Sequence, residues 1–554
     1  MEKVWLDQYQ KAIPHDVKTI HPSVTAYFDD TVVKYKDRPA FACLGKTLSF
    51  DQLRETVETI ANWFQNELGI KKGDKVALMM PNLLQYPTAL FGALKAGATV
   101  VNVNPLYTPR ELEHQLKDSG AETIVILANF AKTLETVLPN VQMKNVIITE
   151  MGDLLGFPKG PLINFVIKKI KKMVPEYNIP RVIAFKELLK PRTTEFKPVT
   201  VNEDDIAFLQ YTGGTTGASK GAILTHKNVC INFTQAQQFL QERMTPETDI
   251  IITALPIYHI FSLVCNCMMF MNQGALNVLI PNPRDMDGFV KELGKWKFTS
   301  ISAVNTLFNG LLHHPQFADL DFSSLQLCLG GGMAVQESVA DKWQKTTGCV
   351  ITQCYGLTET SPAAVICDPT KDKFTGSIGL PIPSTEVSIQ DKDNNILPYG
   401  ERGEVCIRGP QIMAGYLNRP DATAEAITSD GWFHSGDIGT MDDKGNIFIV
   451  DRLKDMIIVS GFNVYPNEIE DVMVGHDNIS EAAAIGIPDQ KSGEVVKLYI
   501  VKENDSLTEE QVMSYCRENL TGYKVPKQIE FLDELPKTNV GKILRRKLKP
   551  DQAS

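Results

Sequence analysis

The sequence lacks any run of about 18 or more uncharged apolar residues, the length that a membrane-spanning helix needs. Its longest apolar candidate, residues 263–279, is interrupted by asparagine, glutamine and glycine, and we expect a buried helix followed by a strand there. The opening residues also lack the basic and apolar regions of a secretory signal peptide. These absences predict a cytoplasmic protein without a spanning segment.

Cysteine pairs with metal-ligand spacing are also missing. None of the 10 cysteines stands in a CxxC pair, so we expect buried, reduced thiols rather than a zinc site or a disulfide framework. The net charge of -10 argues against nucleic acid as a partner, because phosphate backbones attract basic surfaces. An acidic chain can still hold an anionic substrate in a locally positive site.

What is present is an α/β pattern on a chain too long for one core, since 554 residues favour two or more domains. Strand and helix patterns alternate as βαβαβ between residues 75 and 127. Short alternating segments at about 384–450 predict a small β-rich subdomain. A compact α+β unit follows, and we place the boundary between a large N-terminal domain (1–453) and a small C-terminal domain (454–554) in the stretch 451–455.

The most informative segment is a glycine- and threonine-rich stretch at residues 211–221, which follows a strand pattern at 206–209. Glycines let successive backbone N–H groups point at phosphate oxygens, threonine hydroxyls add donors, and Lys220 adds a positive charge. The alternative is a flexible surface loop. The residues that we expect to bind the phosphates of ATP are Thr212, Gly213, Gly214, Thr215, Thr216, Gly217 and Lys220. A Walker loop ends in adjacent Gly-Lys-Ser/Thr, which is absent, so P-loop kinases and GTPases are disfavoured.

This segment resembles the signature of the adenylate-forming, AMP-binding enzymes, which include acyl-CoA synthetases, aryl-CoA ligases, luciferases and the adenylation domains of peptide synthetases. Gly213, where the family usually has Ser or Thr, and Ala218-Ser219 are similar to bacterial long-chain fatty-acyl-CoA synthetases. Segments 80–87, 102–116 and 461–471 resemble the same subgroup. The resemblance covers essentially the whole chain and implies the adenylate-forming fold, with a mobile C-terminal lid domain.

The resemblance implies the remainder of a nucleotide site. Tyr355 and Gly356 would lie at the adenine, with Gly330, Gly331 and Gly332 on the same side. Thr358 would contact phosphate, and Glu359 with Thr212 would hold Mg²⁺, which prefers oxygen ligands. Asp437 would bond the ribose hydroxyls and Arg452 would add a second contact to ribose or phosphate. Taken singly, these residues also suit a capped helix start, a tight turn or a surface ion pair.

The same resemblance assigns the groups that act on the acid. Lys542 would bridge the attacking carboxylate and the α-phosphate, although a solvated basic tail is the alternative for this region. His259 would orient the acid or shape its pocket; the alternative is a core histidine. Lys454 matches the hinge about which the C-terminal domain turns, and Gly461 and Phe462 match the segment that then reaches coenzyme A.

The implied reaction joins a long-chain fatty acid to coenzyme A through an acyl-adenylate, with ATP and Mg²⁺. Its product, a long-chain acyl-CoA, enters fatty-acid degradation. A medium-chain or aryl acid CoA ligase of the same fold is the first alternative. A luciferase-like oxygenase and an ATP-regulated binding protein are the others, and Glu359 together with Lys542 argues against the last. Members of the family often form dimers, so a homodimer is one state that the resemblance allows.

A basic amphipathic segment at residues 162–174 has no counterpart in this chemistry. At helical spacing, one face would carry Ile163, Val166, Ile167, Ile170, Met173 and Val174, and the other Lys168, Lys169, Lys171 and Lys172. Such helices lie on anionic membrane surfaces, so the segment predicts peripheral contact with the cytoplasmic face of a membrane. An ordinary surface helix packed on the large domain is the alternative.

Overall fold

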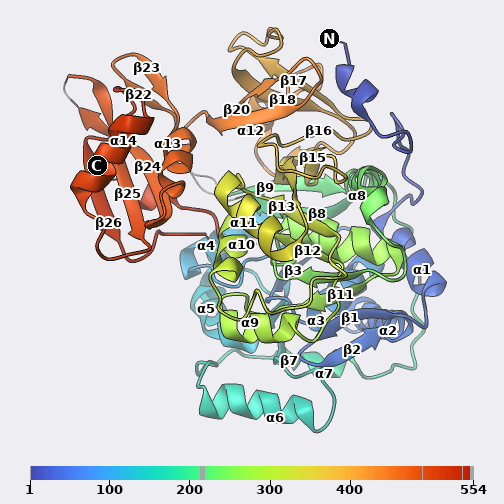
Figure 1. Cartoon of the computed structure of the whole chain (residues 1–554). Helices are drawn as coiled ribbons and strands as arrows, with labels where there is room; N and C mark the ends of the chain where they lie inside the picture. Colours follow the sequence, from blue (N-terminus) through green and yellow to red (C-terminus); the bar gives the residue numbers. More distant parts are fainter. Residues whose placement is uncertain (1, 213–218, 490, 539–540, 550–554) are drawn as a thin grey trace.

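The computed structural model describes residues 2–212, 219–489, 491–538 and 541–549. Figure 1 shows a large body, a β-rich subdomain above it and a C-terminal domain at one side. This arrangement confirms the predicted fold class. Among the described residues, no helix is both long and apolar enough to cross a membrane.

An eight-stranded sheet contains the predicted βαβαβ unit, in which β4 and β5 pair in parallel with the two sides of β3. Every residue of β4 and β5 is buried, as is usual for strands of a parallel sheet covered on both faces. The strands in spatial order are β19 (Gly415–Tyr416), β9 (Lys220–Thr225), β8 (Ile206–Thr212), β4 (Thr99–Asn102), β3 (Lys75–Met79), β5 (Thr123–Leu127), β6 (Asn145–Thr149) and β7 (Val182–Ala184).

A nine-stranded sheet forms the other half of the body, and one hydrophobic core includes residues of both sheets. Its central strands run in parallel, so β13 and β14 end at the same edge and bring their following turns together. The strands in spatial order are β16 (Leu380–Pro381), β15 (Ala363–Ile366), β14 (Ile351–Gly356), β13 (Leu327–Gly331), β12 (Ser300–Ala303), β10 (Ile250–Thr253), β11 (Leu276–Leu279), β1 (Pro39–Cys43) and β2 (Lys46–Ser49).

Helices cover these sheets, and local sequence signals set their ends. Helix α4 begins after Thr108, which forms a reciprocal capping box with Glu111. Helix α3 begins at Gln85 and includes Pro87, because proline is tolerated in a first turn where backbone N–H groups lack partners. The helices of the body are α1 (Val24–Lys34), α2 (Phe50–Asn66), α3 (Gln85–Lys95), α4 (Pro109–Ser119), α5 (Ala131–Val137), α6 (Lys159–Phe165), α7 (Phe185–Leu188), α8 (His226–Leu240), α9 (Met286–Leu293), α10 (Asn305–Leu312) and α11 (Glu337–Thr347).

The β-rich subdomain and the C-terminal domain each have a sheet of their own, and the latter has separate hydrophobic cores. The former contains β17 (Glu386–Gln390), β18 (Gly403–Arg408), β20 (Phe433–Met441), β21 (Ile447–Arg452) and α12 (Pro420–Ala426). The latter contains β22 (Ile457–Val459), β23 (Phe462–Val464), α13 (Pro466–Val474), β24 (Ile479–Asp489), β25 (Gly493–Lys502), α14 (Glu509–Asn519) and β26 (Gln528–Leu532). The sheets change between β21 and β22, while the boundary at 453/454 itself stays a prediction.

Two apolar segments adopt wider helices than the sequence indicates. Residues Ser262–Phe270 form a buried π-helix that leads towards β11, which confirms a buried helix followed by a strand. The expectation of one amphipathic helix at 162–174 is wrong in its extent. Helix α6 ends at Phe165, a π-helical turn covers Val166–Ile170, and Lys172 has a positive φ of 51°. The wide turn shifts the side chains around the axis, so the two predicted faces do not persist along the segment.

Candidate active site

The ends of the predicted phosphate loop lie on two paired strands. Thr212 ends β8, Lys220 begins β9, and the two residues are directly opposite each other in the antiparallel hairpin. The predicted Gly213, Gly214, Thr215, Thr216 and Gly217 lie outside the described residues. The ammonium of Lys220 stands 5.1 Å from the centre of the Tyr416 ring, which places its charge beside the next group of site residues.

Tyr416 connects Lys220 to the predicted metal ligand. Glu359 lies in the turn Thr358–Thr360, directly after β14, and is buried. The Tyr416 hydroxyl donates a hydrogen bond of 2.6 Å to Glu359 Oε1. Burial and the Glu359 carboxylate both raise the pKa of Tyr416, so this hydroxyl remains a donor at neutral pH. Tyr416 occupies one oxygen of this buried carboxylate, and carboxylate oxygens are the donors that Mg²⁺ prefers.

Asp437 is the centre of the predicted ribose site. Strands β20 and β21 place Asp437 opposite Arg452, whose Nε lies 2.6 Å from Asp437 Oδ1. The Tyr355 hydroxyl donates a hydrogen bond of 2.6 Å to Asp437 Oδ2. Burial raises the pKa of Asp437, against the opposing effects of Arg452 and Tyr355. Tyr355, which is predicted to lie at the adenine, is thus held by its hydroxyl to Asp437, the residue predicted to bind the ribose.

The predicted glycines occupy positions where a larger residue would collide. A Cβ on Gly331 would lie 2.7 Å from the carbonyl oxygen of Cys354, and one on Gly356 only 1.8 Å from that of Pro362. Gly332 has a φ of 80°, which favours glycine, and faces Cε of Lys542. The glycine turn after β13 therefore leaves the space in which the C-terminal lysine is held.

Lys542 extends from the C-terminal domain to this site. The Thr538 hydroxyl accepts a hydrogen bond of 3.0 Å from the Lys542 backbone N–H. The Thr306 hydroxyl of α10 donates a hydrogen bond of 3.1 Å to the carbonyl of Gly541. This bond joins the two domains beside the lysine. Burial, with a smaller contribution from the charge of Arg452, lowers the pKa of Lys542 to about 8 against the opposing charges of Asp437 and Glu359. The ammonium thus shares one electrostatic field with the predicted metal and ribose residues.

His259 lies before the buried π-helix and accepts a hydrogen bond of 3.4 Å on Nδ1 from the Phe261 N–H. Burial lowers the pKa of His259 to about 3, and the charge on Lys542 lowers it too, so the imidazole is neutral at physiological pH. Two buried amides position this turn. The Asn82 carboxamide accepts a bond from the N–H of Ile257 and donates to the carbonyl of Leu255, and Gln210 donates to the carbonyl of Tyr258.

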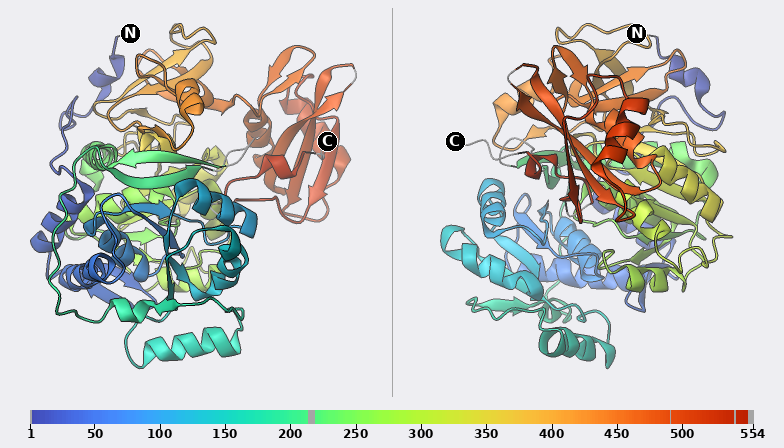
Figure 2. Two further views of the ribbon diagram at one scale, coloured as in Figure 1. Left: turned by 180° about the vertical axis from the view of Figure 1, so that it is seen from behind. Right: turned by 60° about the vertical axis from the view of Figure 1, so that its left-hand side comes forward.

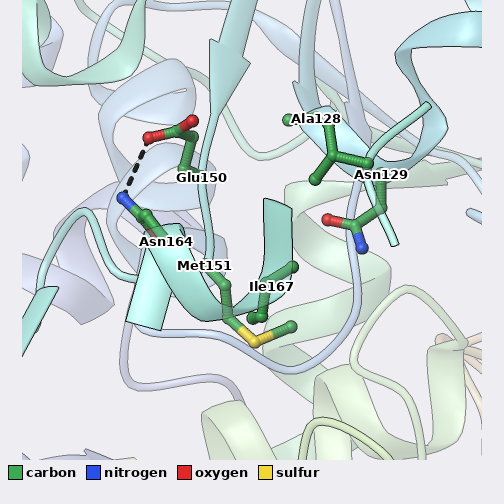
Figure 3. A pocket seen from close by; sticks show the side chains of 7 residues that line it. Ala128, Asn129, Glu150, Met151, Asn164 and Ile167 are labelled. Carbon is green, nitrogen blue, oxygen red and sulfur yellow. Dashed lines mark hydrogen bonds between the residues drawn. The ribbon is translucent and has the colours of Figure 1, made fainter. Parts of the chain in front are cut away.

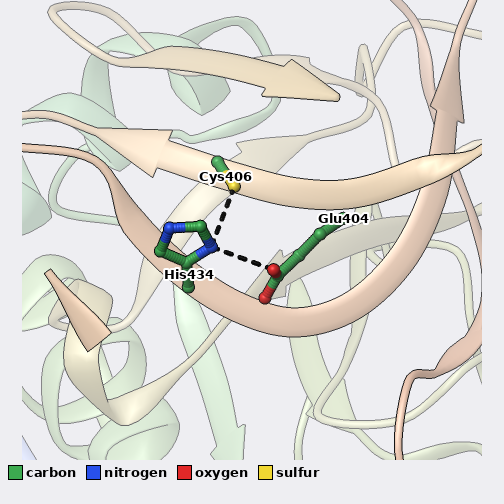
Figure 4. Close-up of side chains that lie close together, drawn as sticks. All are labelled: Glu404, Cys406 and His434. Carbon is green, nitrogen blue, oxygen red and sulfur yellow. Dashed lines mark hydrogen bonds and ion pairs between the residues drawn. The ribbon is translucent and has the colours of Figure 1, made fainter. Parts of the chain in front are cut away.

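A second cluster consists of Glu404, Cys406 and His434, whose side chains lie close together (Figure 4). The Glu404 Oε1 atom accepts a hydrogen bond of 2.8 Å from the N–H of Gly436, next to Asp437. Its Oε2 atom lies 2.9 Å from His434 Nδ1, and Cys406 Sγ stands 3.5 Å from the same nitrogen. Sequence reasoning missed Glu404, Tyr416 and Thr306 because each acts through a partner far away in the chain.

The predicted hinge residue Lys454 lies close enough to the site for its charge to lower the pKa of Lys542, whereas the predicted coenzyme A residues lie on a hairpin elsewhere in the C-terminal domain. Lys454 is exposed in the turn after Arg452. The N–H of the preceding Leu453 donates a hydrogen bond of 2.9 Å to the carbonyl of Gly436. Phe462 is 56% exposed on the β22–β23 hairpin, where its ring stacks on Tyr523. That hairpin stands at the upper edge of the C-terminal domain (Figure 1), apart from the loop that joins Thr306.

The fold and these motifs define an enzyme of the AMP-binding class. Residues 28–417 match the AMP-binding enzyme family, residues 468–542 match the AMP-binding enzyme C-terminal domain, and the chain belongs to this family. It is 53% identical to a long-chain-fatty-acid–CoA ligase of Escherichia coli O6:H1 over all of this chain and 98% of that protein. It is 36% identical to one of Bacillus subtilis, over 99% and 98% of the two chains.

A solved structure has the same architecture. The o-succinylbenzoate CoA synthetase of Bacillus subtilis, in complex with its acyl-adenylate intermediate, superposes with a TM-score of 0.76 at 26% identity. The match covers 95% of this chain and 98% of that one. The architecture described above is therefore shared with that synthetase.

Proposed function

We propose that the chain is a long-chain-fatty-acid–CoA ligase that works through an acyl-adenylate. The names of relatives at 53% and 36% identity over nearly their full lengths support the substrate. The observation that carries the chemistry is the placement of Lys542, which is held by the Thr306 contact among Glu359, Asp437 and Arg452.

In the first half-reaction a carboxylate oxygen of the fatty acid attacks the α-phosphorus of ATP. A P–O bond forms, the bond to the β-phosphate oxygen breaks, and pyrophosphate leaves. The Lys542 ammonium bridges the attacking carboxylate and the α-phosphate, and so stabilises the charge that develops between them. Thr212 and Lys220, which face each other on β8 and β9, hold the phosphates. The Asp437 carboxylate accepts hydrogen bonds from the ribose hydroxyls.

The donor set around Glu359 fits Mg²⁺. Glu359 and Thr212 would hold the ion, which supplies charge neutralisation on the phosphates when it is bound with ATP. Tyr416 keeps the Glu359 carboxylate oriented by its hydrogen bond. His259, being neutral, orients the acid by hydrogen bonding without adding a second positive charge beside Lys542.

In the second half-reaction the thiolate of coenzyme A attacks the acyl carbon, a C–S bond forms, and AMP leaves with the electrons of the C–O bond. Lys542 occupies space that the thiol needs, so the C-terminal domain turns about Lys454 between the halves. That turn would bring Gly461 and Phe462 of the exposed hairpin to the pantetheine chain. The exposed ring of Phe462 supports this role.

The experiment is formation of acyl-CoA and pyrophosphate across acids from octanoate through palmitate to coumarate, with and without coenzyme A. Best turnover on palmitate, with thioester formed only when coenzyme A is present, is the expected result. Best turnover on coumarate would keep the two half-reactions and replace the substrate by aryl acids. Absence of pyrophosphate with every acid would contradict the proposal.

The fatty substrate suggests where the enzyme works. Long-chain acids partition into lipid surfaces, and we propose that the chain makes peripheral contact with an anionic membrane.

The homodimer that the resemblance allows stays a prediction, which sedimentation velocity at micromolar protein would check.

A further inference from the structure

Helix α6 and the turn after it protrude from the body at the end opposite the β-rich subdomain (Figures 1 and 2). Large apolar side chains gather on this protrusion in water-exposed positions. Five of them, at 51% to 91% exposure, lie within 17 residues: Phe157, Leu162, Phe165, Ile170 and Met173. Exposed apolar groups this close together mark a surface that is covered by something else.

The body fixes which side of the segment faces outward. The Asn164 side chain accepts a hydrogen bond of 2.7 Å from the N–H of Gly152 and donates one of 2.9 Å to the Glu150 carboxylate. Figure 3 shows Asn164 and Ile167 directed at the small cavity beneath the helix, together with Met151. The Asn129 side chain donates a hydrogen bond of 3.1 Å to the carbonyl of Met173, which fixes the C-terminal end of the segment.

These contacts revise the predicted faces and make the outward one specific. Ile163, Val166, Ile167 and Val174 of the predicted apolar face are only half-exposed, and Ile163 packs on the core of the body. Leu162 and Phe165, outside that predicted face, are the ones that point into solvent. The exposed apolar side chains are therefore held outward by the inward contacts of their neighbours.

The charge on the protrusion selects its partner. Residues 157–173 contain five lysines and neither aspartate nor glutamate, in a chain whose net charge is -10. Lys168, Lys169, Lys171 and Lys172 are exposed, and no carboxylate in the described part of the chain pairs with them. Apolar side chains ringed by unpaired lysines match the headgroup region of an anionic bilayer, where apolar groups enter and cations meet lipid phosphates.

We propose that residues 157–173 form a docking surface for the headgroup region of an anionic lipid bilayer. Phe157, Leu162 and Phe165 insert between the headgroups, and the lysines of the following turn bind lipid phosphates. The purpose rests on the proposed function: the enzyme meets its fatty acid where that acid accumulates. Binding itself requires no catalysis.

The test is flotation of the full chain with vesicles of phosphatidylethanolamine and phosphatidylglycerol, and separately of phosphatidylcholine alone. One variant carries Phe157→Ser, Leu162→Ser and Phe165→Ser; a second carries Glu at the four lysines 168, 169, 171 and 172. Matched controls carry Ser at the exposed apolar residues Ile20, Val33 and Ile396, or Glu at the exposed lysines 342, 345, 392 and 444.

We expect the unaltered chain to float with anionic vesicles. The partition coefficient should fall about tenfold or more in each surface variant and in 0.5 M salt, and stay within about twofold in both controls. Acyl-CoA formation from detergent-dispersed palmitate should be unchanged in the surface variants, which shows that they fold.

Equal flotation of all variants, or equal binding to neutral vesicles, would overturn the docking surface. No flotation of the unaltered chain with anionic vesicles would also overturn it. Flotation as expected in a chain that forms no acyl-CoA would instead contradict the proposed function and leave the surface intact.

Discussion

The Thr306 hydroxyl donates a hydrogen bond of 3.1 Å to the carbonyl of Gly541, next to Lys542. Thr306 belongs to helix α10 of the N-terminal domain, and Gly541 to the C-terminal domain. The Gly541 φ of 85° and the hydrogen bond at Thr538 bring that carbonyl and the lysine to the site together. In the proposed mechanism, this contact belongs to the domain arrangement that adenylates the acid.

Replacing Thr306 by valine removes this donor and keeps the side-chain shape. We expect adenylation, measured as pyrophosphate exchange, to fall about five- to tenfold, since a single hydrogen bond contributes about 1 kcal/mol. Thioester formation from supplied acyl-adenylate should not change, because that half-reaction uses the other arrangement. An equal loss in both half-reactions would contradict the role assigned to Thr306.

The pKa of Lys542 predicts the alkaline limit of adenylation. Burial lowers this pKa to about 8, below the ordinary lysine value, and the bridging role needs the ammonium form. Pyrophosphate exchange should therefore decline as the pH rises through about 8, with no coenzyme A thiol present to titrate. In Lys542→Arg the residual exchange should stay flat to about pH 10, because the guanidinium keeps its proton. The same decline in the arginine variant would assign the limit to another group.

Backbone freedom at Lys454 should matter more than its side chain. We expect Lys454→Pro to form acyl-adenylate at close to the normal rate and to lose thioester formation by about 100-fold, because proline fixes φ where the domain turns. Lys454→Ala is the matched control, and both its half-reactions should stay within about threefold. Normal acyl-CoA turnover in the proline variant would remove Lys454 from the hinge.

Glu404 should act on ATP through the ribose turn without touching it. In Glu404→Gln the amide oxygen can keep the bond from the Gly436 N–H, and the amide nitrogen then replaces the carboxylate oxygen at His434. We expect the KM for ATP to rise about three- to tenfold, with kcat and the KM for palmitate nearly unchanged. Glu401→Gln, at an exposed neighbouring position, is the control. Parallel changes in both KM values, or only a lower Tm, would indicate a structural role.

Much of this architecture is predictable because its signals are local. The βαβαβ pattern predicted between residues 75 and 127 is confirmed by β3, α3, β4, α4 and β5, since buried runs and capping boxes are set within a few residues. The position of Lys542 beside Gly332 is different, because it depends on how two domains meet.

The misses have physical causes of the same kind. Tyr416 and Glu404 have no local sequence signal; each is a site residue only through a partner 57 or 32 positions away. The apolar face predicted at 162–174 assumed 3.6 residues per turn, and the π-helical turn Val166–Ile170 breaks that spacing. Helical periodicity alone could not show that Leu162 and Phe165 point outward.

The most direct test of the account is a single-turnover comparison of both half-reactions in Lys542→Ala and in the matched tail variant Lys547→Ala. Lys542→Ala should slow acyl-adenylate formation from palmitate and MgATP by about 100- to 1,000-fold, and should still convert supplied palmitoyl-AMP and coenzyme A to palmitoyl-CoA at nearly the normal rate. Lys547→Ala should leave both unchanged. Normal adenylation in Lys542→Ala, or an equal loss in both half-reactions, would contradict the account.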